Sequence, residues 1–72
     1  MEIQYDKEAD ALYIELKKGE FAKNRKVDDL TILDFDDKGH LLGIELLDVS
    51  KRFPMKSIKE VHVKNVALVS SA

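Results

Sequence analysis

The residues with the clearest potential chemistry are acids spaced like a calcium-binding loop. Four positions of the pattern D-x-[DN]-x-[DN]-G-x5-E are matched by Asp34, Asp36, Gly39 and Glu45. Such a loop needs an oxygen ligand at its fifth position as well, and Lys38 places a positive charge there. Both flanks also have the alternation of strands rather than helices. The pattern therefore favours a hairpin with acidic turn residues, and weak divalent-metal binding by Asp34, Asp36 and Asp37 is an alternative.

A second group of acids, Asp6, Glu8 and Asp10, lies near the beginning of the chain. Paired carboxylates can divide general-acid and general-base roles when their surroundings push their pKa values apart. Asp side chains also accept hydrogen bonds from nearby backbone N–H groups and so stabilise turns. The turn explains these residues more simply, and we expect no catalytic residue among them.

Other reactive side chains lack the spacing that their chemistry requires. His40 and His62 are isolated, without the i, i+4 partner of a zinc helix, and the chain has no cysteine. The serines lie in no nucleophile-elbow sequence, and the glycines form no phosphate-binding loop. We expect no metal ligand and no cofactor.

Basic residues gather around residues 17–26 and 51–59, the second group beside Phe53. Lysine and arginine next to an aromatic ring can hold a single-stranded nucleic acid. The formal net charge is −2, however, whereas a nucleic-acid footprint normally comes with a basic domain. Composition thus disfavours nucleic acid as a partner.

Length and composition indicate one small folded domain over residues 1–72. Apolar residues make up 44% of the chain and charged residues 36%, which is typical of a folded domain and not of a disordered tail. The longest apolar run has four residues, 66–69, so we expect neither a membrane span nor a signal peptide. The lack of cysteine fits a reducing compartment, and we expect a cytoplasmic protein.

Period-2 alternation predicts four strands. The first contains Ile3 and Tyr5, and the other three span Leu12 to Leu16, Leu30 to Asp36 and His40 to Leu47. The predicted buried face comprises Leu12, Ile14, Leu16, Leu33, Phe35, Leu42, Ile44 and Leu46. Asp34 would then point to solvent with Leu30 and Ile32. Residues 21–29 are polar and look like a loop with at most short edge pairing.

Turn chemistry gives further local predictions. Asp36 and Gly39 suit a type I turn followed by a glycine bulge, a common hairpin connection. Gly43, inside a strand, indicates a bulge or a close backbone approach.

The C-terminal third has a different period. Ser50 can cap one short helix near residues 51–60, where Met55, Ile58 and Val61 recur at helical spacing and would cover the sheet with Phe53. Alternation over 61–69 is compatible with a fifth strand, although the sequence does not decide between strand and helix. The predicted fold is α+β and mostly β: an antiparallel meander of four to five strands with one short helix.

Three blocks of sequence carry a family resemblance: YDKEADALYI at 5–14, ILDFD at 32–36 and GIELLDVS at 43–50. Together they resemble the domain of unknown function 2283 family, which has no established activity. The resemblance marks positions of interest without assigning a catalyst: Tyr5, Asp6, Ala9, Asp10, Ala11, Asp34, Gly43, Glu45 and Asp48.

These observations favour a non-enzymatic interaction module that acts through self-association or a protein partner. A nucleic-acid-associated or antitoxin-like partner of a small nuclease is one alternative, by analogy only. A weak metal-binding protein is another. Because a short chain gains by burying surface against a copy of itself, we expect a homodimer with most contacts from the C-terminal segment.

Overall fold

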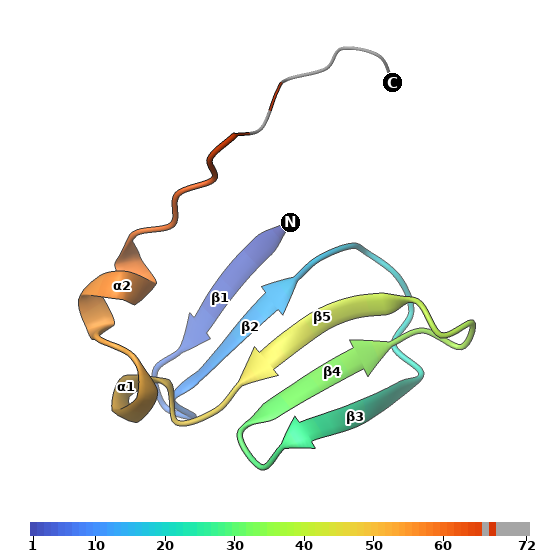
Figure 1. Ribbon diagram of the computed structural model, residues 1–72. Coiled ribbons are helices and arrows are strands. Elements are labelled where there is room, and N and C mark those ends of the chain that lie inside the picture. Colours follow the sequence, from blue (N-terminus) through green and yellow to red (C-terminus); the bar gives the residue numbers. More distant parts are fainter. Residues whose placement is uncertain (66, 68–72) are drawn as a thin grey trace.

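The computed structural model describes residues 1–65 and 67 and contains one five-stranded sheet followed by two short helices (Figure 1). The strands are β1 (Glu2–Asp6), β2 (Ala11–Glu15), β3 (Lys23–Asp28), β4 (Thr31–Phe35) and β5 (Leu41–Leu46). Their order in the sheet is β1-β2-β5-β4-β3, and every neighbouring pair is antiparallel. The predicted α+β class and single antiparallel sheet are confirmed.

Strand order departs from a simple meander at one place. Hairpins join β1 to β2 and β3 to β4 to β5, but β2 pairs with β5 instead of β3. The connection from β2 to β3 therefore passes around one end of the sheet (Figure 1). This order puts the three more apolar strands, β2, β5 and β4, in the interior and the polar strands β1 and β3 at the edges, where charged side chains also discourage pairing with other chains.

The prediction of a loop over 21–29 is wrong over most of its length, because β3 pairs with β4. All six residues of β3 are exposed. An edge strand with solvent on both faces needs no apolar alternation, so its sequence resembles that of a loop. Arg25 lies opposite Leu33, with its guanidinium carbon 5.4 Å from the centre of the Phe35 ring.

The β4–β5 hairpin has the predicted turn. The Gly39 N–H donates to the Asp36 carbonyl at 3.2 Å, and the Asp36 N–H donates to the His40 carbonyl at 3.0 Å. Gly39 has φ +84°, a conformation that side chains disfavour. The Asp36 carboxylate accepts the N–H groups of Lys38 and His40, at 2.9 and 2.8 Å. The acids of this turn thus stabilise the hairpin itself.

Two helices, α1 (Val49–Arg52) and α2 (Met55–Lys59), replace the single predicted helix. Pro54 separates them because it has no N–H and its ring clashes with a preceding helical turn. Ser50 is not the predicted cap. It is the second residue of α1, and Asp48 occupies the N-cap position. Within the described residues no helix is long and apolar enough to cross a membrane.

Beyond α2, residues 61–65 and 67 have no regular structure, so the strand predicted over 61–69 is absent from them. The remaining positions of that prediction lie outside the described residues.

One side of the sheet, here called the apolar face, contains the side chains predicted to share it. Cross-strand register aligns Ile3, Ile14, Ile44 and Leu33 in one row, and Leu12 and Leu46 in the next. Among the described hydrophobic residues, however, only Leu42 and Val49 are buried, and the other predicted face residues are half-buried.

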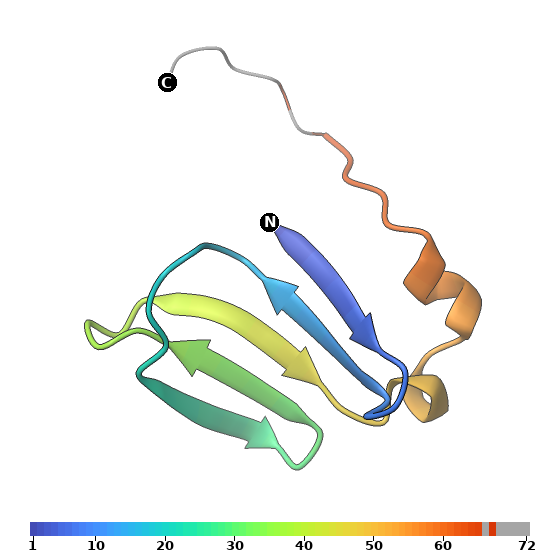
Figure 2. The same cartoon turned by 180° about the vertical axis from the view of Figure 1, so that it is seen from behind.

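The predicted cover is partial, which explains this exposure. The helices lie at one end of the sheet, near β1, as views from both sides agree (Figures 1 and 2). Phe53 and Met55 are each 39% exposed, and Ile58 is half-buried. The helical segment therefore covers only part of the apolar face, beside Ile3, Leu12 and Leu46, and the sheet remains largely a single layer.

Candidate functional site

The candidate positions fall into two groups, at one end of the sheet and on the face opposite the apolar face. The first contains Tyr5, Asp6, Ala9, Asp10, Ala11 and Asp48. The second contains Asp34, Gly43 and Glu45.

The end group begins with the β1–β2 turn. The Asp6 carboxylate accepts the N–H groups of Glu8 and Ala9, at 3.0 and 3.1 Å. Asp10 then adopts the left-handed conformation, with φ +51°, and Ala11 opens β2 opposite Asp6. Asp6 thus has the turn-forming role that its sequence context predicts.

Asp10 joins this turn to the start of α1 through a set of contacts here called the hairpin clasp, made by Tyr5, Asp10 and Ser50. The Asp10 carboxylate accepts the Tyr5 hydroxyl at 2.7 Å, the Ser50 hydroxyl at 2.7 Å and the Ser50 N–H at 3.0 Å. Its carbonyl accepts the Val49 N–H at 3.1 Å. The hairpin clasp therefore ties together segments forty residues apart in the sequence.

The charge state of the hairpin clasp argues against acid catalysis by Asp10. Hydrogen bonds from Tyr5 and then Ser50 hold the pKa of Asp10 below its usual value, whereas donation to Asp10 raises the pKa of Tyr5. A general acid at neutral pH would need a raised pKa instead. The arrangement is that of a structural tie.

A second tie runs from α1 to the start of β4. The Arg52 guanidinium donates to the Leu30 carbonyl at 2.7 Å, the Leu47 carbonyl at 3.2 Å and the Thr31 hydroxyl at 3.2 Å. Asp48, with φ +51°, directs the chain into α1, and its backbone carbonyl accepts the Arg52 N–H at 3.1 Å. Sequence reasoning counted Arg52 among surface basic residues and missed this role.

The second group lies on the polar face, defined by Tyr13, Ile32, Asp34, Gly43 and Glu45. Asp34 does point away from Leu33 as predicted, but the expectation of solvent exposure is wrong, since it is only 6% exposed. It lies opposite Gly43, where a Cβ would clash with the Tyr13 hydroxyl. Because Gly43 has no side chain, Tyr13 can lie over it, which confirms the predicted close approach.

Three titratable side chains, Tyr13, Asp34 and Glu45, lie on the polar face. Burial, followed by a hydrogen bond and repulsion from Asp34, raises the pKa of Glu45. Burial and then repulsion from Asp34 raise the pKa of Tyr13. Oδ1 of Asp34 is buried and has no hydrogen-bond partner.

The calcium-loop pattern does not assemble as a site. Asp34 and Glu45 lie on the polar face, whereas Asp36 is bonded within the hairpin, with Oδ2 3.0 Å from Nδ1 of His40. Across the described part of the chain, no three His, Cys, Asp or Glu side chains are arranged to hold a metal ion.

Two hollows border these groups. An open one of about 890 Å³ lies between the β1–β2 turn and the polar face, with Gln4, Asp6, Lys7, Tyr13 and Glu45 among its lining. A smaller apolar groove of about 200 Å³ separates α2 from the sheet. Its lining is Ile3, Leu12, Leu46, Phe53, Ser57, Ile58 and Val61.

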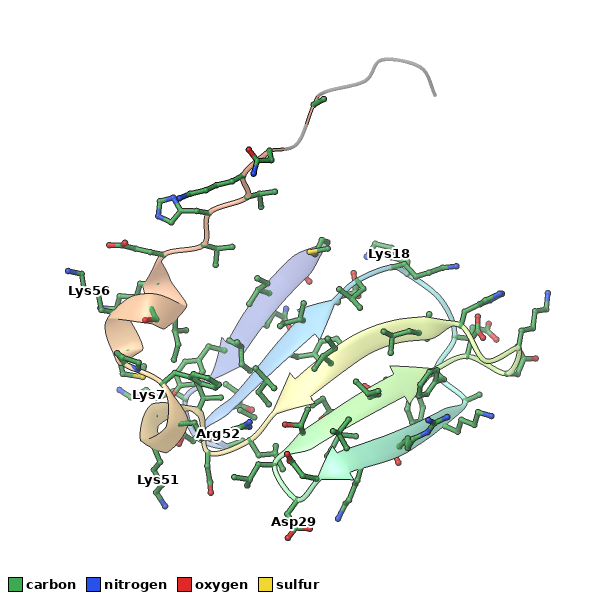
Figure 3. All side chains as sticks on the ribbon, in the orientation of Figure 1. Lys7, Lys18, Asp29, Lys51, Arg52 and Lys56 are labelled. Atoms are coloured by element: carbon green, nitrogen blue, oxygen red, sulfur yellow. The ribbon has the colours of Figure 1, made fainter. Side chains whose placement is uncertain are left out.

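The two basic groups stay apart. Lys18 lies at the opposite end of the sheet from Lys51 and Lys56, which point away from it (Figure 3). Arg52 is engaged with backbone carbonyls, with its guanidinium carbon 5.2 Å from the centre of the Phe53 ring. Lys18 and the pair Lys51 and Lys56 therefore lie on separate parts of the surface.

Fold and site define a small α+β protein with a one-layer sheet and structural ties where its sequence motifs meet. The model of the family described as protein of unknown function (DUF2283) matches residues 2–50, and the chain belongs to that family. A relative described as uncharacterized, from Methanocaldococcus jannaschii, is 38% identical over 53 residues. The alignment covers 74% of this chain but 45% of the relative, so the chain spans less than half of that protein. No solved structure matches the chain.

Proposed function

We propose that the protein is a self-association module that covers its apolar face with the same face of a second copy. The observation that carries the proposal is the one-layer sheet. Six side chains on this face remain only half-buried: Leu12, Ile14, Leu33, Phe35, Ile44 and Leu46. An apolar sheet face is normally buried against a second layer, and the short helices supply one over only part of this face.

The size of the apolar face suits a small dimer that also uses the C-terminal segment. Five strands about 4.8 Å apart, each about five residues long at 3.4 Å per residue, have a flat footprint of roughly 400 Å². Specific interfaces bury about 800 Å² per partner. Exposed apolar side chains beside the sheet would enlarge the contact, including Val61 (59% exposed) and Val63 (75%).

A second copy fits this surface because its central rows are uncharged. Ile3, Ile14, Ile44 and Leu33 form a continuous aliphatic row across four strands. Two such rows can meet without burying a charge if Arg25, which continues the row on the edge strand β3, stays at the rim of the contact. An unlike partner would need a complementary aliphatic surface of its own. Two-fold association is also the commonest arrangement of soluble oligomers.

Neighbouring residues on β4 offer a matched test. Leu33 and Ile32 are both half-buried, and they project from opposite faces of the sheet. Sedimentation equilibrium should find the wild-type protein dimeric. Leu33→Lys should shift it to monomer, while Ile32→Lys should leave the association constant near that of the wild type.

Circular dichroism and the milder Leu33→Ala variant distinguish loss of association from misfolding. Leu33→Ala should weaken association and keep the spectrum of the folded protein. A wild-type protein that stays monomeric at high concentration contradicts the proposal, as does equal weakening by both lysine variants. In a monomer, the apolar face would instead be covered by the protein's own C-terminal residues or by a different protein.

A further inference from the structure

We propose that Asp34 and Glu45 hold one proton between them in the folded protein. This shared proton would make the folded state more stable at acidic pH than at neutral pH. Glu45 would donate to the unpartnered Oδ1 of Asp34. This inference concerns the face opposite the apolar face and does not depend on self-association.

Geometry provides the first argument. Asp34 lies on an interior strand, is 6% exposed, and has an Oδ1 atom with no donor. Buried polar atoms almost always have a hydrogen-bond partner, so an unpaired carboxylate oxygen calls for a donor that the neighbouring side chains can supply. Glu45 lies on the adjacent strand β5 and on the same face, diagonally across from Asp34, because Glu45 pairs with Ile32 and Gly43 pairs with Asp34. A protonated carboxyl at Glu45 is therefore the donor that completes the contact.

The side chains around the pair give the second argument, because the acidic ones among them favour a bound proton on the pair. From β2, Tyr13 and Glu15 face the pair. From β3, the neutral Asn24 lies opposite Asp34, and Lys26, one step further along this face, is exposed. Edge strand β1 adds Glu2 and Gln4, and the β1–β2 turn adds Asp6, Lys7 and Glu8 to the open hollow that Glu45 lines. Among the described residues, neither Asp34 nor Glu45 forms a salt bridge.

Tyr13 completes the arrangement by shielding it. Its ring can lie over the polar face only because Gly43, directly opposite Asp34, has no side chain. Shielding from water disfavours two adjacent negative charges and favours the singly protonated pair.

The sign of the pH dependence follows from the raised pKa of Glu45. Stabilisation from the shared proton is complete below the unfolded pKa of Glu, about 4.5, and is lost as pH rises through the folded pKa. One proton changes the unfolding equilibrium constant by at most about tenfold per pH unit. Asp10 and Asp36 have lowered pKa values, so their contributions are lost at the acid end instead, below the usual value of 3.8.

The test is urea unfolding of the wild type and two single variants between about pH 4.5 and 8, a window set by the usual pKa of Glu. The equilibrium constant for unfolding of the wild type should increase as the pH rises through this window. Glu45→Gln should remove most of that dependence, because its amide donates to Asp34 at every pH. Glu15→Gln removes a charge from the same face and should keep the wild-type profile.

Carbon-13 NMR of the wild-type carboxyl groups provides a measurement that needs no variant. Glu45 should titrate above its usual range. A Glu45 that titrates at its ordinary pKa would overturn the proposal, and so would identical pH profiles for wild type and Glu45→Gln.

Discussion

Replacing Gly43 with alanine tests how the polar face is built. The added methyl group would overlap the Tyr13 hydroxyl and lie 2.6 Å from its Cζ and 2.9 Å from the Ile14 carbonyl oxygen. Ordinary contacts are about 3.5–4.0 Å, so the methyl group would clash with both neighbours. The Tyr13 ring can rotate away, but the Ile14 carbonyl belongs to the backbone of an interior strand and cannot.

Overpacking of this kind typically costs about 1–3 kcal/mol of unfolding free energy. For a domain of this size, that corresponds to a fall of roughly 5–20 °C in the thermal midpoint. Circular dichroism during heating, with urea unfolding at fixed temperature, measures both quantities. Gly43→Ala should also make the Tyr13 ring more accessible to solvent.

A double-mutant cycle separates the tyrosine from the carbonyl. Tyr13→Ala removes the larger clash, so part of the cost of Gly43→Ala should disappear in the double variant. Contacting residues usually show coupling of about 0.5–3 kcal/mol. An unchanged midpoint for Gly43→Ala, or strictly additive effects, would refute the placement of Tyr13 over Gly43.

Three other predictions concern the core, the hairpin clasp and metal. Leu42→Ala should cost about 2–5 kcal/mol, as deletions at fully buried sites do, and Ile44→Ala should cost less at low protein concentration because Ile44 is half-buried. Equal costs in dilute urea titrations would mean that the apolar face is already covered within one chain. Asp10 has a lowered pKa, so stability should fall as pH decreases below about 3.8, and Asp10→Asn should flatten that acid limb in urea titrations. Calorimetry should detect no tight calcium binding, and micromolar affinity that is lost in Glu45→Gln would contradict this.

The sequence determined the features that depend on neighbouring residues. Alternation in the segments 11–16 and 31–35 predicts which side chains share the apolar face, because successive side chains of a strand point to opposite sides. The spacing of Asp36 and Gly39 predicts their turn, since its hydrogen bonds close within five residues. Family membership also followed from local blocks of sequence.

Tertiary structure decided what depends on partners distant in the chain. Residues 23–28 form a strand only because they pair with β4, so their own sequence contains little indication of a strand. Asp34 is buried on a face where Tyr13, from another strand, lies over the neighbouring Gly43, and no local pattern predicts that arrangement. Likewise Ser50 bonds Asp10 instead of capping a helix, since the fold brings together residues forty positions apart. Local periodicity specifies a side chain's direction, whereas its surroundings come from pairing and packing across the whole chain.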